Sequence, residues 1–424
     1  MRVLLSTYGS RGDVQPMAAL AVALRGLGAE VRVCAPSDEE FAKLLAGAGV
    51  EFVPAADPVR TVVTGSAPMA PEALPQRAAA MTVAQYEAVL AGSAGCDAVV
   101  ATGLVPAVAA ARSVAETLGV PFFYVAFFPT MLPSLHHRPH ALPGRPFPPG
   151  ETDNQTLWDI NSENFRLLYG PGINAHRQAL GQPVVDDVVR HVFTGRPFLA
   201  ADPVLAPWPQ SSDLDLDLDL DVLQTGAWLL SDERPLPADL LAFLDRGEPP
   251  VYVGFGSMPM RGASDVGRVA VEAVRAQGRR VVVGRGWADL GLVDEQGDCF
   301  VVGDVNHQAL FPRTAAVVHH GGAGTTTTAA RAGAPQVIVP QLVDQPYWGA
   351  RVAELGVGAL HDGPTPTFDS LSAALIVALA PETRARATAL APTVRTDGAN
   401  IAARRLFDLN LNLDHDHDHD HDRS

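Results

Sequence analysis

The residues from His319 to Thr325, His-His-Gly-Gly-Ala-Gly-Thr, have the composition of an anion-binding turn. An apolar run that predicts a strand precedes them, and an alanine- and threonine-rich stretch that predicts a helix follows. Glycines here let backbone N–H groups approach an anion, and the first helical turn adds unpaired donors and about half a positive charge. The segment therefore predicts a diphosphate site, although an ordinary glycine turn explains these residues equally well when they are taken alone.

A second candidate for chemistry is Asp13, in a glycine-containing turn between residues 6 and 16 that follows the first apolar run. A carboxylate on a loop at the carboxyl end of a strand can take a proton from a hydroxyl group. Such a general base contributes about 10²–10⁴-fold to a rate. An aspartate just before Pro16 is equally suited to be a helix N-cap. The turn lacks the G-x-G-x-x-G spacing of a dinucleotide site.

Composition limits the classes to which the chain can belong. Its 424 residues exceed one hydrophobic core and predict two domains, and 47% apolar with 18% charged residues is typical of a globular protein. Nine of the sixteen net negative charges come from two tracts, the aspartates between Asp213 and Asp221 and the tail after residue 413. The remaining body carries about −7 and presents no basic field for nucleic acid or anionic lipid.

Three features bear on cellular context. The chain begins without a positively charged apolar leader, and no apolar run approaches the roughly 20 residues needed to cross a bilayer. Cys34, Cys96 and Cys299 are odd in number and far apart, which predicts buried thiols instead of disulfides or metal ligands. We therefore expect a cytoplasmic protein without a membrane span.

The elements that position Asp13 belong to a first α/β domain, expected at residues 1–205. Apolar runs and helical patterns alternate here, which predicts a parallel sheet covered on both faces. A stretch rich in proline and histidine at 129–152 predicts a ligand-binding or mobile loop. Strands are expected at 3–6, 31–34, 98–101, 122–126 and, as the last one, 198–201, and helices at 16–27 with Pro16 in the first turn, at 41–48, up to Leu118 and at 161–179.

A second α/β domain, at 238–396, positions the glycine turn. Prolines and an Asp-Leu tract predict a linker at 206–237 before it. A helix at 397–413 and a low-complexity tail at 414–424, expected to be disordered, complete the chain. Within the domain, strands are expected at 251–255, 280–284, 299–302, 316–319 and 336–339, and helices at 265–276, 325–332, 347–355 and, with breaks at Pro381 and Pro392, at 371–406.

The spacing of residues around the glycine turn matches a known family. Pro340, twenty residues after His320, opens the run Pro-Gln-Leu-Val-Asp-Gln. The order His-x-Gly-x-x-Ser/Thr, Gly-x-Pro and Pro-x-x-x-Asp-Gln is that of inverting family 1 glycosyltransferases, which act on natural products, sterols and flavonoids. This chain resembles them at His320, Gly322, Thr325, Gly333, Pro335, Pro340, Asp344 and Gln345.

The resemblance implies a nucleotide-sugar site in the second domain. The stacking tryptophan of plant relatives is replaced here by Val305-Asn306-His307-Gln308. His319 is expected to pack or to support the site and not to bind directly. The residues implied are Ser10, Gly12, Ser257, His320, Gly322, Gly324 and Thr325 for the diphosphate, Asp344 and Gln345 for hydroxyls of the donor sugar, and Arg285 and Val305 for the nucleoside.

The N-terminal turn is similar to that of actinomycete glycopeptide-antibiotic glycosyltransferases and of sterol glucosyltransferases, which share Gly-x-Arg-Gly-Asp. In the glycopeptide enzymes the matching aspartate, here Asp13, is the proposed general base, and we favour that role over a helix cap. The resemblance covers almost the whole chain and is weakest at 54–156, where the acceptor should bind. Phe127, His136 and His137 are candidate acceptor residues, with a core role for the phenylalanine and a solvated loop for the histidines as the alternatives.

The resemblance implies the GT-B fold, two facing Rossmann-like domains with parallel sheets and a cleft between them. The expected reaction is inverting transfer of a hexose, with UDP-glucose as the preferred donor and a TDP-sugar as an alternative. The expected acceptor is a hydroxyl of an aglycone such as a glycopeptide antibiotic. No metal or other cofactor is expected. The partners are the nucleotide sugar and the aglycone, and the chain should be a monomer or weak dimer.

Three other functions remain open: a glucosyltransferase for a sterol or other lipophilic polycycle, a catalytically silent auxiliary protein of the same fold, and a nucleotide-sugar epimerase. Because both Asp13 and His320 are present, a silent protein is disfavoured. The alternating aspartates from Asp213 to Asp221 could form a cation-binding face on a strand, but they lie in the linker. The alternating Asp-His tail could chelate a transition metal without taking part in catalysis.

Overall fold

The structure is a computed structural model that describes residues 1–55, 57–64, 71–209, 220–257, 263–287, 290 and 296–421. The chain divides into two compact units. Unit 1 comprises Met1–Ala201, Trp208–Leu230 and Thr396–Ser424, and unit 2 comprises Asp202–Pro207 and Ser231–Arg395. Each unit is built on a parallel sheet with helices, so the predicted pair of Rossmann-like domains is confirmed.

Unit 1 contains a seven-stranded sheet in the order β3-β2-β1-β4-β5-β6-β7, with every neighbouring pair parallel. The central strand β1 is buried from Val3 to Tyr8, because helices cover both faces of a parallel sheet and leave no polar side to the strand. The strands are β1 Arg2–Tyr8, β2 Glu30–Pro36, β3 Glu51–Ala55, β4 Ala98–Gly103, β5 Phe122–Ala126, β6 Phe198–Leu199 and β7 Leu223–Gln224.

Strand β3 was not among the predicted strands, and the two strands at the opposite edge of this sheet also differ from the sequence-based expectation. The strand predicted at 198–201 is not the last, because β7 follows it from within the segment expected to be a linker. Leu223 and Gln224 pair in parallel with Phe198 and Leu199. Strands of two residues are too short to show an alternating pattern, and only their pairing identifies them.

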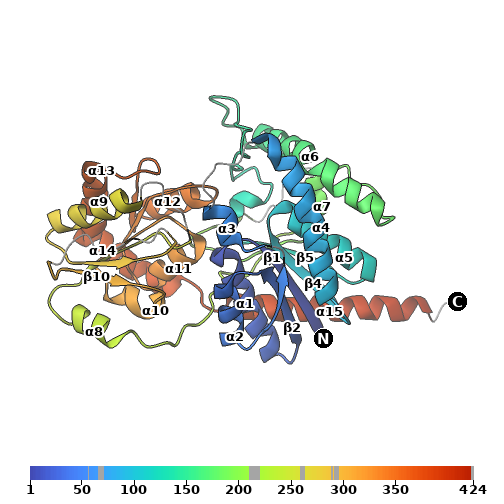
Figure 1. The fold of residues 1–424 in the computed structure, drawn as a ribbon, viewed down its shortest axis with the longest axis horizontal. Helices are drawn as coiled ribbons and strands as arrows, with labels where there is room; N and C mark the ends of the chain where they lie inside the picture. The colour runs from blue at the N-terminus through green and yellow to red at the C-terminus, as the bar shows by residue number, and fades with distance from the viewer. Residues whose placement is uncertain are drawn as a thin grey trace. The chain divides into compact units, whose positions relative to one another are not determined.

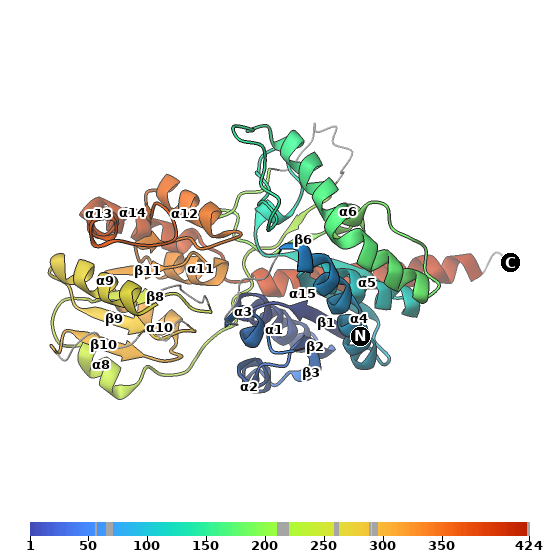
Figure 2. The same cartoon turned by 45° about the horizontal axis from the view of Figure 1, so that its top comes forward.

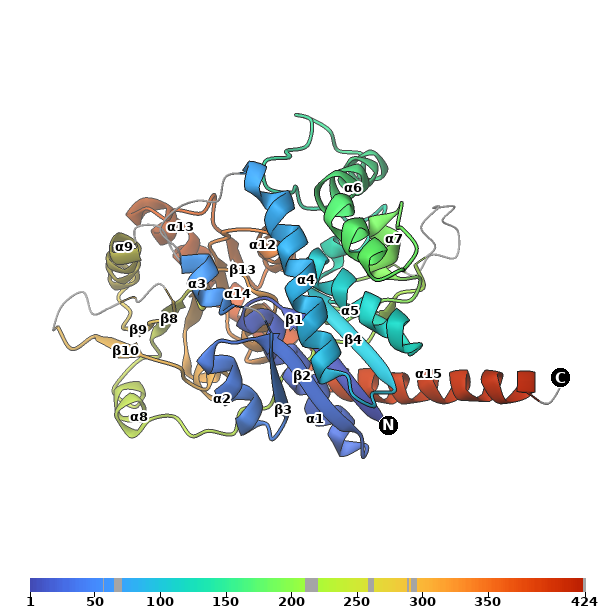
Figure 3. The same cartoon turned by 45° about the vertical axis from the view of Figure 1, so that its right-hand side comes forward.

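The helices of unit 1 form two groups. Contacts join α4, α5, α6 and α7 into one group and α1, α2 and α15 into the other. Figures 1 and 3 show α15 running beside α1. α15 extends to His421, well beyond the predicted end at residue 413, as expected when a nucleated helix adds further turns. The helices are α1 Arg11–Gly26, α2 Glu39–Gly47, α3 Val59–Thr64, α4 Leu74–Gly92, α5 Val105–Leu118, α6 Asn154–Ala179, α7 Val188–Phe193 and α15 Gly398–His421, with 3₁₀ turns at Pro71–Ala73 and Pro129–Met131.

Unit 2 contains a six-stranded parallel sheet in the order β10-β9-β8-β11-β12-β13. One hydrophobic cluster joins the sheet to α9 and α13, and a second joins its other face to α8, α10 and α11 (Figure 2). The strands are β8 Val251–Gly254, β9 Val281–Gly284, β10 Cys299–Val302, β11 Ala316–His319, β12 Gln336–Ile338 and β13 Gly358–Leu360. The helices are α8 Ala238–Leu244, α9 Ala263–Ala276, α10 His307–Leu310, α11 Ala323–Arg331, α12 Gln345–Glu354, α13 Phe368–Leu379 and α14 Pro381–Leu390, with 3₁₀ turns at Phe311–Arg313 and Ala391–Thr393.

The described residues contain no helix long and apolar enough to span a membrane. None of the three cysteines forms a disulfide, but only Cys34 is buried, and Cys96 and Cys299 are partly exposed. The prediction of three buried thiols is therefore wrong for two of them. Cys96 belongs to the turn before β4, and Cys299 opens β10 at one edge of its sheet, where neighbours cover fewer sides.

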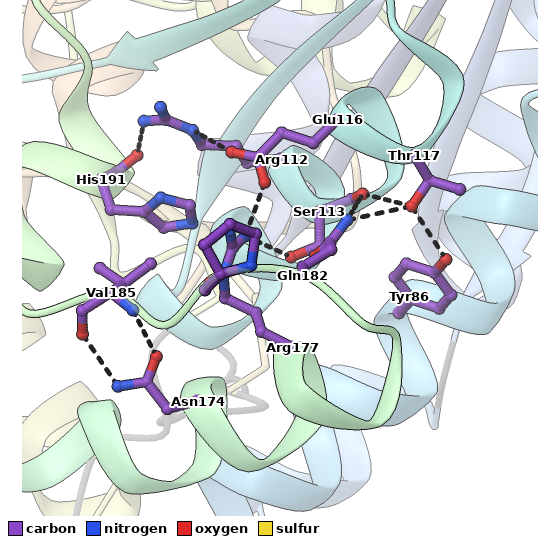
Figure 4. A network of polar contacts seen from close by, with 11 residues as sticks. Tyr86, Arg112, Ser113, Glu116, Thr117, Asn174, Arg177, Gln182, Val185 and His191 are labelled. Atoms are coloured by element: carbon purple, nitrogen blue, oxygen red, sulfur yellow. Dashed lines mark hydrogen bonds and ion pairs between the residues drawn. The ribbon is translucent and has the colours of Figure 1, made fainter.

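A polar network ties α6 and the segment after it to α5 (Figure 4). Arg177 of α6 has a side chain only 5% exposed, and it contacts Glu116 of α5 at 2.7 Å. Its Nε also donates to the carbonyl oxygen of Pro183 at 2.7 Å. Burial, together with the charges of Arg112 and Arg177, lowers the pKa of His191 to about 3, so this histidine is neutral. A buried guanidinium is tolerated here because it is paired and hydrogen-bonded.

We expect Glu116→Ala to lower the free energy of unfolding by about 3 kcal/mol, because it leaves the Arg177 charge buried without its carboxylate. The matched control is Glu163→Ala, which removes the ion pair between Glu163 and Arg166. Both of these side chains are about half exposed. That loss should be within about 1 kcal/mol. Urea unfolding followed by circular dichroism compares the two variants, and equal losses would contradict the assigned role of the network.

Candidate active site

The predicted phosphate turn connects β11 to α11 in unit 2. Gly322 is the N-cap of α11, and the first hydrogen bond of this helix runs from Thr326 N–H to the Gly322 carbonyl at 2.9 Å. The N–H groups of Ala323, Gly324 and Thr325 therefore precede the hydrogen-bond ladder of the helix and can bind an anion. The helix begins two residues before the predicted start at 325, which places Gly324 inside the first turn.

The threonines of α11 are not equivalent. The hydroxyls of Thr326, Thr327 and Thr328 each donate to the carbonyl four residues earlier, at 2.8 to 3.0 Å. Such bonds satisfy the hydroxyl inside the helix. No hydrogen bond of the Thr325 hydroxyl occurs among the residues that the structure describes. Thr325 is thus the hydroxyl of this run that is suited to a ligand, as the family resemblance implies.

His320 lies between two glycine turns. A Cβ atom on Gly322 would approach its Nε2 to 2.5 Å, and one on Gly256 would approach its Cε1 to 3.2 Å. Its Nδ1 is buried and has no hydrogen-bond partner among the described residues. Although part of the side chain is exposed, burial lowers the pKa of His320 to about 4. The ring is neutral at pH 7 and can donate one N–H to an anion.

The Gly256-Ser257 turn after β8 is held against the turn after β9. The Trp287 N–H donates to the Gly256 carbonyl at 2.9 Å, and a Cβ atom on Gly286 would approach the same oxygen to 2.5 Å. Both glycines have positive φ, +56° and +55°. This packing and the close approach of Gly256 to His320 place the next residue, the partly exposed Ser257, near the phosphate turn.

The predicted sugar-binding pair, Asp344 and Gln345, lies at the start of α12. The Gln345 amide oxygen accepts from the N–H groups of Gln341 and Leu342, at 2.7 and 3.1 Å, so it shapes its own loop. A Cβ atom on Gly321 would lie 3.2 Å from the Gln345 carbonyl oxygen, so this loop contacts the phosphate turn. Val343 has φ +53°, a strained conformation for a β-branched residue that costs roughly 1–3 kcal/mol.

Asp344 is held by a tryptophan one turn later. The Trp348 indole N–H donates to Asp344 Oδ2 at 2.7 Å, and the indole is buried. Burial raises the pKa of Asp344 to about 6, while the hydrogen bond from Trp348 lowers it. A carboxylate with this pKa is ionised at pH 7 and can accept hydrogen bonds from two hydroxyl groups.

The Asp344 pKa predicts a pH dependence for donor use. As the pH falls through about 6, the carboxylate gains a proton and loses its charge and part of its acceptor capacity, so kcat/KM for the donor should decrease. Trp348→Phe removes the bond that lowers the pKa, and the decrease should then begin at a higher pH. The control is Trp228→Phe, which removes another buried indole hydrogen bond, to Thr225, in unit 1. Identical pH profiles for wild type and Trp348→Phe would contradict the assignment.

Asp13 lies in the first turn of α1, not before it. Ser10 is the N-cap: its Oγ accepts from Gly12 N–H at 3.3 Å, and its own N–H donates to Asp13 Oδ2 at 2.8 Å. Asp13 is thus the third residue of a capping box, and the alternative that it is the N-cap itself is wrong. The predicted start of the helix near Pro16 is also wrong, because the capping box begins the helix at Arg11 and proline remains inside it.

The geometry leaves Asp13 partly exposed and fixed in position. A Cβ atom on Gly9 would collide with the Asp13 carboxylate, at 2.1 Å from Oδ2, so any other residue at this position would have to displace that carboxylate. The cap also occupies Ser10 and Gly12, which were predicted as diphosphate ligands. The cap and the general-base role are compatible, because a carboxylate has two oxygens and about four acceptor positions.

The residues predicted to bind the nucleoside and the acceptor lie partly in the core and partly at the surface. Val305 packs in the hydrophobic cluster under α8 and α10, while the Arg285 side chain is exposed. In unit 1, Phe127 is buried edge-on against Trp228, with ring centroids 6.1 Å apart. His136 is exposed, and His137 stacks on Trp208 at 5.5 Å. Of the acceptor candidates, the two histidines reach the surface, and the phenylalanine contributes to the core.

Comparison with known proteins identifies the family. A model of the glycosyltransferase family 28 N-terminal domain matches residues 3–136, and a model of the erythromycin biosynthesis protein CIII-like C-terminal domain matches residues 293–400. The vancomycin aglycone glucosyltransferase of Amycolatopsis orientalis is 53% identical over 96% of this chain and 97% of the relative. The chain belongs to the glycopeptide glycosyltransferases. This glycosyltransferase is also 48% identical to the dTDP-epi-vancosaminyltransferase of the same organism, over 96% of this chain and 97% of the relative.

Solved structures agree with the fold of this glycosyltransferase. The glycotransferase of kitacinnamycin has a TM-score of 0.70 and 20% identity, covering 96% of this chain and 98% of the other. At this level of identity the likeness concerns the fold, which is the GT-B fold predicted from the sequence.

Sequence reasoning did not find three residues that shape the site. Trp348 holds Asp344, and its spacing of four residues from the aspartate on a helix was an available signal. Gly9 makes room for the Asp13 carboxylate, and Trp287 anchors the turn of Ser257. Neither has a local signal, because each acts through a contact that only the folded chain creates. The aspartates from Asp213 to Asp219 and residues 422–424 lie outside the described residues.

Proposed function

We propose that this glycosyltransferase moves a hexose from a nucleoside-diphosphate sugar to a hydroxyl group of a glycopeptide aglycone, with inversion and without a metal. The observation that carries the proposal is the convergence in unit 2 of His320, the α11 N-terminus and the Asp344 loop. His320 and the α11 N-terminus are suited to bind a diphosphate, and the Asp344 loop is suited to bind sugar hydroxyls. The name of one relative, a vancomycin aglycone glucosyltransferase, supports the acceptor class.

In the proposed mechanism, Asp13 takes the proton from the acceptor hydroxyl as that oxygen attacks the anomeric carbon. The bond from this carbon to the diphosphate oxygen breaks, and the nucleoside diphosphate leaves. His320, Thr325 and the N–H groups that begin α11 would meet the charge on the leaving group. Donors fixed in place for a developing negative charge are commonly the largest single contribution to catalysis. This supports a metal-independent transfer.

UDP-glucose is the preferred donor in this proposal, because Asp344 and Gln345 form the pair that usually holds glucose hydroxyls in the resembling family. The glucosyltransferase relative supports glucose. A TDP-linked deoxysugar is the second candidate, and the dTDP-epi-vancosaminyltransferase relative specifically favours it. The protein is proposed to act in the cytoplasm, where nucleotide sugars are available.

The test is to incubate the protein with UDP-glucose or TDP-glucose, with a panel of glycopeptide aglycones and sterols, in the presence of a chelator. Mass spectrometry should find an aglycone heavier by one hexose, and NMR should show the anomeric configuration opposite to that of the donor. Product formed only after a divalent metal is restored would refute metal independence. Free sugar or an epimerised donor without any glycosylated acceptor would refute the proposed transfer.

A further inference from the structure

We propose that His319, the residue before the candidate phosphate ligand, is a positioning residue that locks the β11–α11 turn in its diphosphate-binding shape. The inference rests on the proposed function of this turn. His319 ends β11 and is completely buried, so it cannot contact a donor itself. Its role must therefore be exerted through the residues that its ring touches.

Both ring nitrogens of His319 have partners with defined roles. The Gly321 N–H donates to Nδ1 at 3.1 Å, so Nδ1 carries no proton. Nε2 lies 2.9 Å from the side-chain oxygen of Gln336 on β12. The proton of a neutral ring must then be on Nε2, where it donates to Gln336. Only one tautomer of the neutral ring satisfies both bonds, and a protonated ring would break the bond to Gly321.

The surroundings of His319 keep the ring neutral. Burial is the largest of the effects that lower its pKa to about 3; the charges that His320 and His307 would carry act in the same direction, and the bond to Gln336 acts in the opposite one. These two histidines and Gln336 are the groups that act on the ring. The hydrogen bond from Gly321 to His319 is therefore present at every pH at which the enzyme is expected to work.

Gly321, whose N–H bonds to His319, has little conformational freedom. Gly321 has φ +93°, and a Cβ atom there would lie 2.7 Å from Ile338 Cγ2 and 3.2 Å from the Gln345 carbonyl oxygen. The backbone at Gly321 therefore packs closely between β12 and the loop that contains Asp344 and Gln345. Because the Gly321 N–H is used by His319, the backbone N–H groups of this turn that remain for a phosphate begin with Gly322. The bond sets the direction in which His320 and the helix N-terminus leave the strand.

Gln336→Glu tests the lock without touching the donor site. A carboxylate 2.9 Å from Nε2 would favour the imidazolium form and so raise the pKa of His319. We expect the Kd for UDP or TDP, measured by calorimetry, to be near wild type at pH 8 and about tenfold weaker at pH 6. The wild type should show no such weakening from this residue. Gln336→Met, which removes the acceptor without adding charge, is the matched control and should bind with little dependence on pH.

A second readout needs no activity. In ¹⁵N-labelled wild type, NMR should show the His319 ring neutral, with its proton on Nε2, from pH 5 to pH 8. A ring that titrates in this range, a proton on Nδ1, or a Gln336→Glu variant whose Kd does not depend on pH would overturn the inference. Absence of glycosyl transfer in the wild type would count against the proposed function instead, since neither nucleotide binding nor the tautomer requires an acceptor.

Discussion

Asp13→Asn is expected to lower kcat of the glycosyl transfer by about 10²–10⁴-fold, the usual contribution of a general base. Asparagine keeps the shape of the side chain, and its amide oxygen can still accept the Ser10 N–H that Asp13 Oδ2 accepts at 2.8 Å. It cannot take a proton from the acceptor. The KM for the donor and the midpoint of unfolding should therefore stay close to wild type. Steady-state kinetics with the donor and aglycone that yield product in the proposed assay provide the measurement.

The control separates catalysis from helix capping. Asp187 is the exposed N-cap of α7 and accepts from Arg190 N–H at 2.9 Å, so Asp187→Asn makes the same chemical change at another helix start. Its turnover should equal that of the wild type. If Asp13→Asn retains full turnover, the base is a different group. If it loses turnover only in proportion to a fall in unfolding temperature, Asp13 is a structural cap.

His320→Ala is expected to reduce kcat/KM for the donor by about 10²–10³-fold, the loss typical when one donor to a developing oxyanion is removed. The neutral ring lies between the Gly256 and Gly322 turns, and its buried Nδ1 makes no bond to the described residues. A diphosphate oxygen would supply the missing partner. Binding of UDP or TDP should weaken in parallel, which calorimetry can measure directly.

The control for this variant is His176→Ala, on α6 of unit 1, where the ring packs edge-on against Tyr86 at 4.8 Å. This histidine is partly exposed, and its removal should leave kcat/KM unchanged. Equal nucleotide affinity in His320→Ala and the wild type would remove His320 from the donor site. The phosphate contacts would then have to come from the helix N-terminus, Thr325 and Ser257.

Prediction from the sequence worked best where the signal is local. The strands at 122–126, 299–302 and 316–319 match β5, β10 and β11, because a short run of apolar residues is typical of a strand in a parallel sheet. It failed at β7, whose two residues become a strand only by pairing with β6. It also misplaced the start of α1, because Pro16 suggested a first turn while the Ser10 and Asp13 capping box set the boundary.

The residue types and their order along the chain can be read from the sequence alone: a glycine turn after a strand, an Asp-Gln pair at a set distance from His320, and an aspartate in the segment after the first strand. These follow from local propensities and from residue identity. The tertiary structure alone decided that the Gly321 N–H binds His319, that Trp348 holds Asp344 and that Gly9 faces the Asp13 carboxylate. Hydrogen bonds and close approaches of this kind depend on backbone angles and on packing between strands and helices, which residue types alone do not specify.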